Sequence, residues 1–334
     1  MSSVFKVSVI IPVYNAAQFI RTAVNSAIKL NETGEVILID DGSVDDSLEI
    51  CLQLANEFDN LVVLQHNDKC NHGVSATRNL GIHNAKFDFV AFLDVDDYYL
   101  PNRFLKDKEI LMSNSDVDGV YNALGIHYYS EKGKQKFINA GYKYQEFYTL
   151  SGNVPSNELF FVLFNAHSSV TGEFHGDTIT VRKNIFEKSG NFPINLKLKE
   201  DTHLWRRMAA KCTLVPGDIF EPVAIRGVHD NNTMVNKAIQ PKANKIWWND
   251  LHKWLINNNV NSDYVECFDG AYLYYKLNNQ SFLLSLWAFI VFFFKYPHHI
   301  KIKYGRFDIC FFKLFGKNWF SVHLISFKNH MNKA

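Results

Sequence analysis

Cysteine is scarce in this chain, and its few copies form no recognisable pairing pattern. The 334 residues contain Cys51, Cys70, Cys212, Cys267 and Cys310, an odd number with no Cys-x-x-Cys spacing. The 13 histidines likewise show no zinc-ligand spacing such as His-x-x-x-His. A disulfide framework and a structural zinc site are therefore excluded, and we expect reduced thiols in a cytoplasmic protein.

Long apolar runs are also absent. The most apolar stretch, residues 282–294, has thirteen residues, whereas a helix that spans a bilayer needs about 20. The first six residues lead directly into an apolar strand-like run and lack the features of a secretory signal. We therefore expect a protein that is neither secreted nor membrane-spanning. Apolar residues still make up 47% of the chain, which is enough for a full core.

Acidic residues are nearly missing from the C-terminal end. Residues 295–334 contain eight Lys or Arg and one acid, Asp308, so this tail carries +7 while the remainder of the +1 chain carries −6. Aromatic residues, among them Phe311, Phe312 and Trp319, stand between the basic ones. The combination favours helices on an anionic membrane surface, and a buried packing helix or a dimer interface is the alternative. Because the charge is confined to this apolar tail, nucleic acid is excluded as a partner.

Short β-branched runs alternate with helical periodicity in the first hundred residues. Strands are predicted at 7–13, 36–39, 61–64 and 89–93, and helices at 17–30, 45–58 and 74–85. This alternation predicts parallel βαβ units in a doubly wound, Rossmann-like α/β sheet. Farther along, the patterns predict strands at 117–121 and 178–181, a hairpin or loop at 128–148, and a helix at 201–210. We divide the chain into an α/β domain, residues 1–236, and a helical, aromatic and basic extension, residues 237–334.

Polar clusters stand where the predicted strands end. Tyr14 and Asn15 follow the first strand, Asp40-Asp41-Gly42-Ser43 ends the second, and Asp94-Val95-Asp96-Asp97 ends the fourth. Ligands of such sheets bind at the carboxyl ends of the strands. Crowded carboxylates repel one another unless a cation neutralises them, and their oxygens suit Mg²⁺ or Mn²⁺ carrying nucleotide phosphates. The alternative is that these acids form an N-cap and its neighbours at the start of a helix that Pro101 begins.

Five stretches of the chain carry a family resemblance. They are Val9–Asn15, Ile39–Ser43, Gly73–Gly81, Phe92–Asp97 and Lys199–Asp201. In their order and spacing they resemble family 2 glycosyltransferases with the GT-A fold, nucleotide-sugar-dependent enzymes that build bacterial surface polysaccharides. The resemblance covers roughly residues 5 to 230 and implies the GT-A form of the α/β sheet.

The resemblance implies a nucleotide site. Its members would be Pro12, Tyr14, Asp40, Asp41, Ser43, Arg78 and Asp94. Asp40 would accept the uracil imide or a ribose hydroxyl, Pro12 and Tyr14 would line the base pocket, and Arg78 would approach the nucleotide. The residues alone leave alternatives open, because Asp40–Ser43 has the composition of a plain turn, Tyr14 can be a packing aromatic, and Arg78 can form a surface salt bridge.

The resemblance also implies a metal site. Asp94 would face the ribose or the metal, Asp96 would ligate Mn²⁺ or Mg²⁺ on the diphosphate, and Asp97 could share either task. Arg226-Gly227-Val228-His229 matches the family's Arg-x-x-His loop. His229 could therefore reach the diphosphate or the metal, with an ordinary surface histidine as the alternative.

Glu200-Asp201 precedes a predicted helix. The resemblance makes Asp201 the general base that accepts the proton of an acceptor hydroxyl, with Glu200 as the alternate. Displacement in line with the departing diphosphate would invert the anomeric centre. The alternative is a first helical turn whose acids complement the helix dipole. A glycine-containing stretch, Thr171–Asp177, could approach a ligand with its backbone or be a simple turn.

The resemblance therefore implies an inverting enzyme that takes a sugar from a nucleotide diphosphate, UDP above all. The acceptor would be a hydroxyl of a glycan or lipid-linked carrier in cell-surface polysaccharide synthesis, with the C-terminal segment on the inner face of the cell membrane. Transfer to polyprenyl phosphate and an inactive nucleotide-sugar-binding relative are the alternatives. A nucleotidyltransferase is disfavoured because the first strand lacks a Gly-rich, basic loop for a triphosphate.

Overall fold

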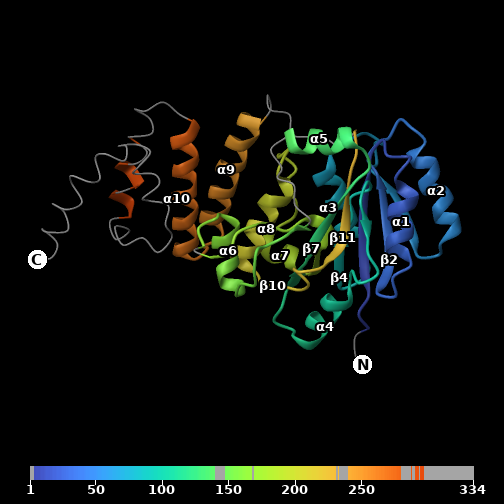
Figure 1. Ribbon diagram of the computed structural model, residues 1–334, viewed down its shortest axis with the longest axis horizontal. Helices are drawn as coiled ribbons and strands as arrows, with labels where there is room; N and C mark the ends of the chain where they lie inside the picture. The colour runs from blue at the N-terminus through green and yellow to red at the C-terminus, as the bar shows by residue number, and fades with distance from the viewer. Residues whose placement is uncertain are drawn as a thin grey trace, which may run out of the picture. The chain divides into compact units, whose positions relative to one another are not determined.

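A seven-stranded sheet organises the N-terminal part of the chain (Figure 1). The computed structural model describes residues 4–139, 147–167, 169–230, 232, 240–279, 287, 290–292 and 294–296. In sheet order the strands are β10 (Leu214–Pro216), β6 (Gly119–Tyr121), β9 (Ile179–Arg182), β4 (Phe89–Phe92), β1 (Val7–Val13), β2 (Thr33–Asp40) and β3 (Leu61–Gln65). Neighbouring strands run parallel except β9, which is antiparallel to both β4 and β6.

Helices follow the first three strands as predicted. They are α1 (Ile20–Ile28), α2 (Ser47–Glu57) and α3 (Val74–Asn84), each slightly shorter than its sequence pattern. β1 is buried at every position except Pro12, as expected of a strand covered on both faces. α1 buries Ile20, Ala23, Val24 and Ala27, the spacing of a single apolar helix face. Each predicted element of this region is confirmed, so the strand ends meet at one edge of the sheet.

A smaller, four-stranded sheet includes β5 (Tyr98–Tyr99), the strand that follows β4 in the chain. Its order is β5, β11 (Pro222–Val228), β7 (Ala123–Tyr128) and β8 (Phe147–Tyr148). β5 follows directly after the Asp94–Asp97 turn and pairs with β11. This pairing brings the loop after Val228 close to the Asp94–Asp97 turn, which we call the acidic turn.

One sequence prediction in this region is wrong. Residues 128–148 were expected to form a hairpin or loop, but α5 (Glu131–Asn139) lies there before β8. The helix is polar, and it buries only Gly133 and Phe137, four residues apart. Two buried positions give too weak a period to separate a helix from a loop.

The remaining helices complete two compact units. They are α4 (Leu105–Ser113), α6 (Ser156–Leu163), α7 (Ile185–Ser189), α8 (Glu200–Lys211), α9 (Gln240–Asn257) and α10 (Ser262–Asn279), with a 3₁₀ turn, η1, at Gly176–Thr178. One unit comprises residues 1–160 and 170–251, and the other comprises 161–169 and 252–334. The described C-terminal part is helical, as predicted.

The membrane prediction is not reached by the described residues. None of their helices combines the length and apolarity that crossing a membrane requires. The predicted boundary after residue 236 and most of the apolar, basic tail lie outside the described ranges. Contact of the tail with a membrane surface therefore stays a prediction.

Candidate active site

The loops after β1 and β2 are joined by reciprocal hydrogen bonds. The Asn15 amide donates to Ser43 Oγ at 3.0 Å, and the Val44 amide donates to Asn15 Oδ1 at 2.8 Å. Asn15 has φ +49, a left-handed conformation that asparagine tolerates. Beside it, Tyr14 leaves 51% of its surface exposed at the end of β1. Ser43 thus stabilises the loop after β1, while the Tyr14 ring is exposed and could stack on a ligand.

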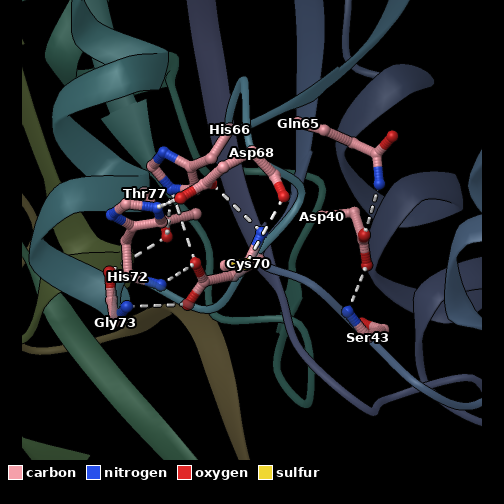
Figure 2. A network of polar contacts seen from close by, with 10 residues as sticks. Asp40, Ser43, Gln65, His66, Asp68, Cys70, His72, Gly73 and Thr77 are labelled. Carbon is pink, nitrogen blue, oxygen red and sulfur yellow. Dashed lines mark hydrogen bonds and ion pairs between the residues drawn. The ribbon is translucent and has the colours of Figure 1, made fainter.

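Asp40 lies at the end of β2 with both carboxylate oxygens oriented by the protein. Oδ2 accepts the Gln65 side-chain amide at 2.9 Å, and Oδ1 accepts the Ser43 backbone amide at 3.2 Å (Figure 2). The residue is 1% exposed. Gln65 ends β3 and was not singled out in the sequence, because one glutamine at a strand end has no pattern of its own. These bonds fix the carboxylate plane, and each oxygen retains a second lone pair.

Asp41 holds the entry to α3. Its Oδ1 accepts the His72 amide at 2.7 Å, and its Oδ2 accepts the Gly73 amide at 2.9 Å. Gly73, with φ +86, immediately precedes the helix. The observed side-chain contacts of Asp41 are therefore with the backbone of the β3–α3 loop and with His66, whose Nε2 lies 3.4 Å from Asp41 Oδ1. The predicted contact of Asp41 with the nucleotide stays a prediction.

Arg78 joins the two halves of the predicted site. Its Nη2 donates to Asp94 Oδ1 at 2.7 Å, and its Nη1 donates to Glu200 Oε1 at 3.2 Å. The side chain is 8% exposed, so the surface salt bridge considered as its alternative is wrong. Burial alone would lower the pKa of Arg78, but the surrounding carboxylates of Asp94, Glu200 and Asp201 raise it above its usual value. A permanent cation thus stands between the acidic turn and the start of α8.

A buried pair, His175 and Asp177, supports the acidic turn and was not predicted from the sequence. Asp177 Oδ1 accepts the Asp94 amide at 2.8 Å, and Asp177 Oδ2 lies 3.1 Å from His175 Nδ1. Burial raises the pKa of Asp97 well above its usual value, with Asp177 adding to the effect. Burial alone would also raise the pKa of Asp177, but His175 and a hydrogen bond with Asp97 lower it. The glycine-containing stretch before β9 was the one available signal, and it gave no role to either residue.

Asp96 faces the loop after β11. His229 Nε2 lies 3.2 Å from Asp96 Oδ2, and the Asn232 side-chain amide donates to the same oxygen at 2.8 Å. The Phe19 ring stacks on the His229 ring, with centroids 4.5 Å apart. The structure thus brings His229 to the acidic turn, as the Arg-x-x-His pattern predicted. Asn232 joins it without having been predicted.

The donor set suits a divalent cation. Among the described residues, Asp94, Asp97, His175 and Asp177 each offer a ligand atom within 4.8 Å of the others. This group shares Asp94 and Asp97 with the predicted metal ligands but contains neither Asp96 nor His229, whose metal role stays a prediction. Burial raises the pKa of Asp96, and the charge of Asp94 raises it further. Burial is the main cause of the raised carboxylate pKa values, and the neighbouring carboxylates add to it, so a bound cation would favour the ionised forms. Oxygen-rich ligands with an imidazole are compatible with Mg²⁺ or Mn²⁺.

Glu200 and Asp201 form the first turn of α8, which begins after Lys199. Burial and the neighbouring Asp201 raise the pKa of Glu200, while Arg78 opposes the shift. Asp201 is half-buried, and its Oδ1 accepts the Thr202 amide at 2.6 Å. Both acids therefore complement the helix dipole, and the predicted role of Asp201 as a base stays a prediction.

Comparison with known proteins connects this geometry to one family. The model of the family described as "Glycosyl transferase family 2" matches residues 8–169. These residues form a family 2 glycosyltransferase domain. This range contains the loops after β1 and β2 and the acidic turn. Five candidate site residues follow it in the chain, namely His175, Asp177, Glu200, Asp201 and His229.

Curated relatives of the domain are bacterial. An uncharacterized glycosyltransferase of Rickettsia typhi is 27% identical over 74% of this chain and 72% of its own length. The minor teichoic acid biosynthesis protein GgaA of Bacillus subtilis is 34% identical over 40% of this chain and 30% of its own length. An uncharacterized glycosyltransferase of Rickettsia conorii is 31% identical over 62% of this chain, which again covers 30% of that relative. The chain thus spans under a third of several relatives that it matches.

Solved structures establish the fold. Residues 1–349 of S. aureus TarS in complex with UDP-GlcNAc superpose with a TM-score of 0.60 at 20% identity, over 83% of this chain and 75% of that one. TarS 1–349 in complex with UDP gives 0.55 at 20% identity, over 80% and 69%. The predicted α/β fold of GT-A type is confirmed.

Proposed function

We propose that this chain is an inverting glycosyltransferase that moves a sugar from a UDP-sugar to a hydroxyl of a glycan or lipid-linked acceptor in cell-surface polysaccharide synthesis. The observation that carries the proposal is the buried Arg78 fork between Asp94 and Glu200. Arg78 links Asp94, in the predicted nucleotide site, to Glu200, which directly precedes the predicted base Asp201. The UDP-GlcNAc named for the TarS neighbour supports UDP as the carrier.

The nucleotide would lie over the carboxyl ends of β1 and β2. Asp40 is buried and preoriented, which suits recognition of a uracil imide or a ribose hydroxyl. The exposed Tyr14, with Pro12 beside it, would cover the base. Ser43 and Asp41 would act mainly by fixing the surrounding loops, because their observed bonds run to backbone amides and, for Asp41, also to the His66 side chain.

A divalent cation, Mn²⁺ or Mg²⁺, would be held at the acidic turn. Asp94 and Asp97 belong to the group of mutually close donors, and Asp96 and His229, which lie against each other, would complete the ligand set. When bound, it would neutralise the charge that develops on the departing diphosphate. The protein's own part is orientation. Asp177 holds the backbone of Asp94, and Asn232 holds the carboxylate of Asp96.

Asp201 would accept the proton of the acceptor hydroxyl, since an alcohol attacks poorly until its proton is removed. Glu200 is paired with Arg78, so its contribution would be to hold the Arg78 guanidinium in place rather than to accept the proton. With Asp201 on the side of the sugar opposite the diphosphate, attack in line inverts the anomeric centre.

The acceptor can be tested through Asp201. Purified full-length chain is incubated with Mn²⁺, a panel of UDP-, GDP- and TDP-sugars and alcohol acceptors, and nucleotide release is measured. Activity with a UDP-sugar supports the proposal, and Asp201→Asn should reduce it by about 100-fold or more. Tight UDP binding without turnover across acceptors would instead identify an inactive relative.

Polyprenyl phosphate remains the second candidate acceptor. The basic, aromatic tail of residues 295–334 would suit its phosphate and lipid, and would hold the chain at the inner face of the cell membrane. A phosphate acceptor is already ionised near neutral pH. Asp201→Asn should then cost less than about tenfold, which separates the two acceptor classes.

A further inference from the structure

A tryptophan of α9 contacts the residue that introduces the two acids of α8. The indole Nε1 of Trp247 donates a hydrogen bond to the Lys199 carbonyl at 3.1 Å. Trp247 is 6% exposed. Lys199 directly precedes Glu200 and Asp201 in the chain, so its conformation sets the direction in which both acids leave the turn.

Lys199 has an unusual backbone for a lysine. Its φ is +62 and its ψ +27, in the left-handed region, which is unfavourable for residues other than glycine, asparagine and aspartate. The Lys199 carbonyl accepts two further donors, Thr202 Oγ1 at 3.0 Å and the His203 amide at 3.1 Å. Of these three donors, the Trp247 indole is the one from outside this turn, so in the described part of the chain it links the carbonyl of the left-handed residue to α9.

Three other contacts place α9 against α8. Lys199 Nζ donates to Asn244 Oδ1 at 3.1 Å, and His203 Nε2 lies 3.2 Å from Asp250 Oδ2. The Arg206 guanidinium lies over the Trp247 ring, 5.3 Å from its centroid. Residues 244, 247 and 250 recur every three positions, which places them along one side of α9. These contacts all belong to the compact unit that carries the candidate active site.

We propose that Trp247 is a positioning residue for the transfer reaction, acting through the Lys199 carbonyl on the orientation of Asp201. The proposal rests on the proposed function and extends it to a segment, 237–334, that the sequence reading placed in an appended extension. Its chemical reason is that a general base must stand within hydrogen-bond reach of the proton it accepts. A misplacement of about 1 Å can reduce the rate by about 100-fold.

The test compares Trp247→Phe, which keeps an aromatic ring but loses the donor, with Trp248→Phe, the same change at the next residue. In Trp247→Phe, kcat for sugar transfer should fall about 10- to 100-fold. The Kd for UDP with Mn²⁺ should stay within about twofold, because the nucleotide loops lie on other elements. Amide hydrogen exchange over residues 200–203 should become about five-fold faster, the effect of one lost hydrogen bond. Trp248→Phe should change none of these.

A second substitution tests the route through Lys199. Asparagine tolerates the left-handed region better than lysine. Lys199→Asn, added to Trp247→Phe, should therefore restore part of the lost kcat, by about threefold or more. No recovery, an unchanged kcat in Trp247→Phe, or equal losses of kcat and UDP affinity in both tryptophan variants would overturn the proposal. Absence of transfer by the unsubstituted chain, with UDP bound, would instead refute the proposed function.

Discussion

At the scale of single residues, Arg78 is the group on which the candidate site depends most. Its guanidinium is buried and binds two carboxylates far apart in the chain, Asp94 and Glu200. A lysine could not bind both in the same way, because its ammonium lacks the planar fork. The pairing explains how buried acids persist near one another.

Removal of this cation should destabilise the protein. Arg78→Ala leaves two carboxylates without their buried partner, and we expect the free energy of unfolding to fall by about 3 kcal/mol in urea titrations. Arg21→Ala is the matched control, since Arg21 pairs with Glu57 at the surface with both side chains 47% exposed. That loss should stay below about 1 kcal/mol. Equal losses in the two variants would argue against a special role for Arg78.

We expect Asp177 to affect the binding of Mn²⁺ rather than the recognition of the nucleotide base. Asp177→Ala removes the acceptor of the Asp94 amide and the partner of His175. Residues that orient metal ligands typically change affinity 10- to 100-fold, so Mn²⁺ binding in calorimetry should weaken by about that factor. Asp118→Ala removes a carboxylate that binds Lys188 instead, and it should leave Mn²⁺ affinity unchanged. A similar loss in both variants would indicate general unfolding.

At the scale of elements, the β2–α2 and β3–α3 loops are packed against each other through glycine. Gly42 has φ +74, and a Cβ there would lie 2.8 Å from the Asn71 amide nitrogen. Gly73 has φ +86, with nothing within 4 Å of an added Cβ. Both glycines thus have a positive φ that would strain any residue with a Cβ, but they differ in the space available to an added Cβ.

The pair therefore gives a direct comparison. Gly73→Ala should cost about 1 kcal/mol in the free energy of unfolding, from its backbone conformation alone. Gly42→Ala should cost about 2 kcal/mol more, because the Asn71 backbone must also move. Urea titration of both variants measures the difference. An equal cost would show that the two loops are not closely packed in solution.

The α8–α9 contact should respond to acid. Burial lowers the pKa of His203 to about 4, although Asp250 opposes the shift. An unfolded chain binds a proton there below about pH 6.5, whereas the folded chain does not until about pH 4. The folded state therefore loses stability as pH falls from about 6.5 to about 4. Measured over that range, His203→Gln should reduce the pH-dependent loss by about 2 kcal/mol, and an unchanged slope would contradict the assignment.

At the scale of the whole molecule, a site residue could be predicted from the sequence when a regular strand positions it, and could not when only tertiary packing does. Asp40 and Asp94 end strands with strong apolar patterns, so their meeting at one sheet edge follows from parallel βαβ topology. Asp177 and Trp247 arrive from an antiparallel strand turn and a helix far along the chain. Local periodicity says nothing of such long-range contacts, which depend on tertiary packing.

The central claim is that the acidic turn and the β1–β2 edge form one metal-dependent nucleotide site. Calorimetric titration of the full chain with UDP, with Mn²⁺ and then with chelator, tests it most directly. We predict that UDP binding weakens at least about tenfold on chelation and equally in Asp96→Ala with Mn²⁺ present. UDP affinity that is unaffected by chelator and by Asp96→Ala, or no UDP binding at all, would contradict the account.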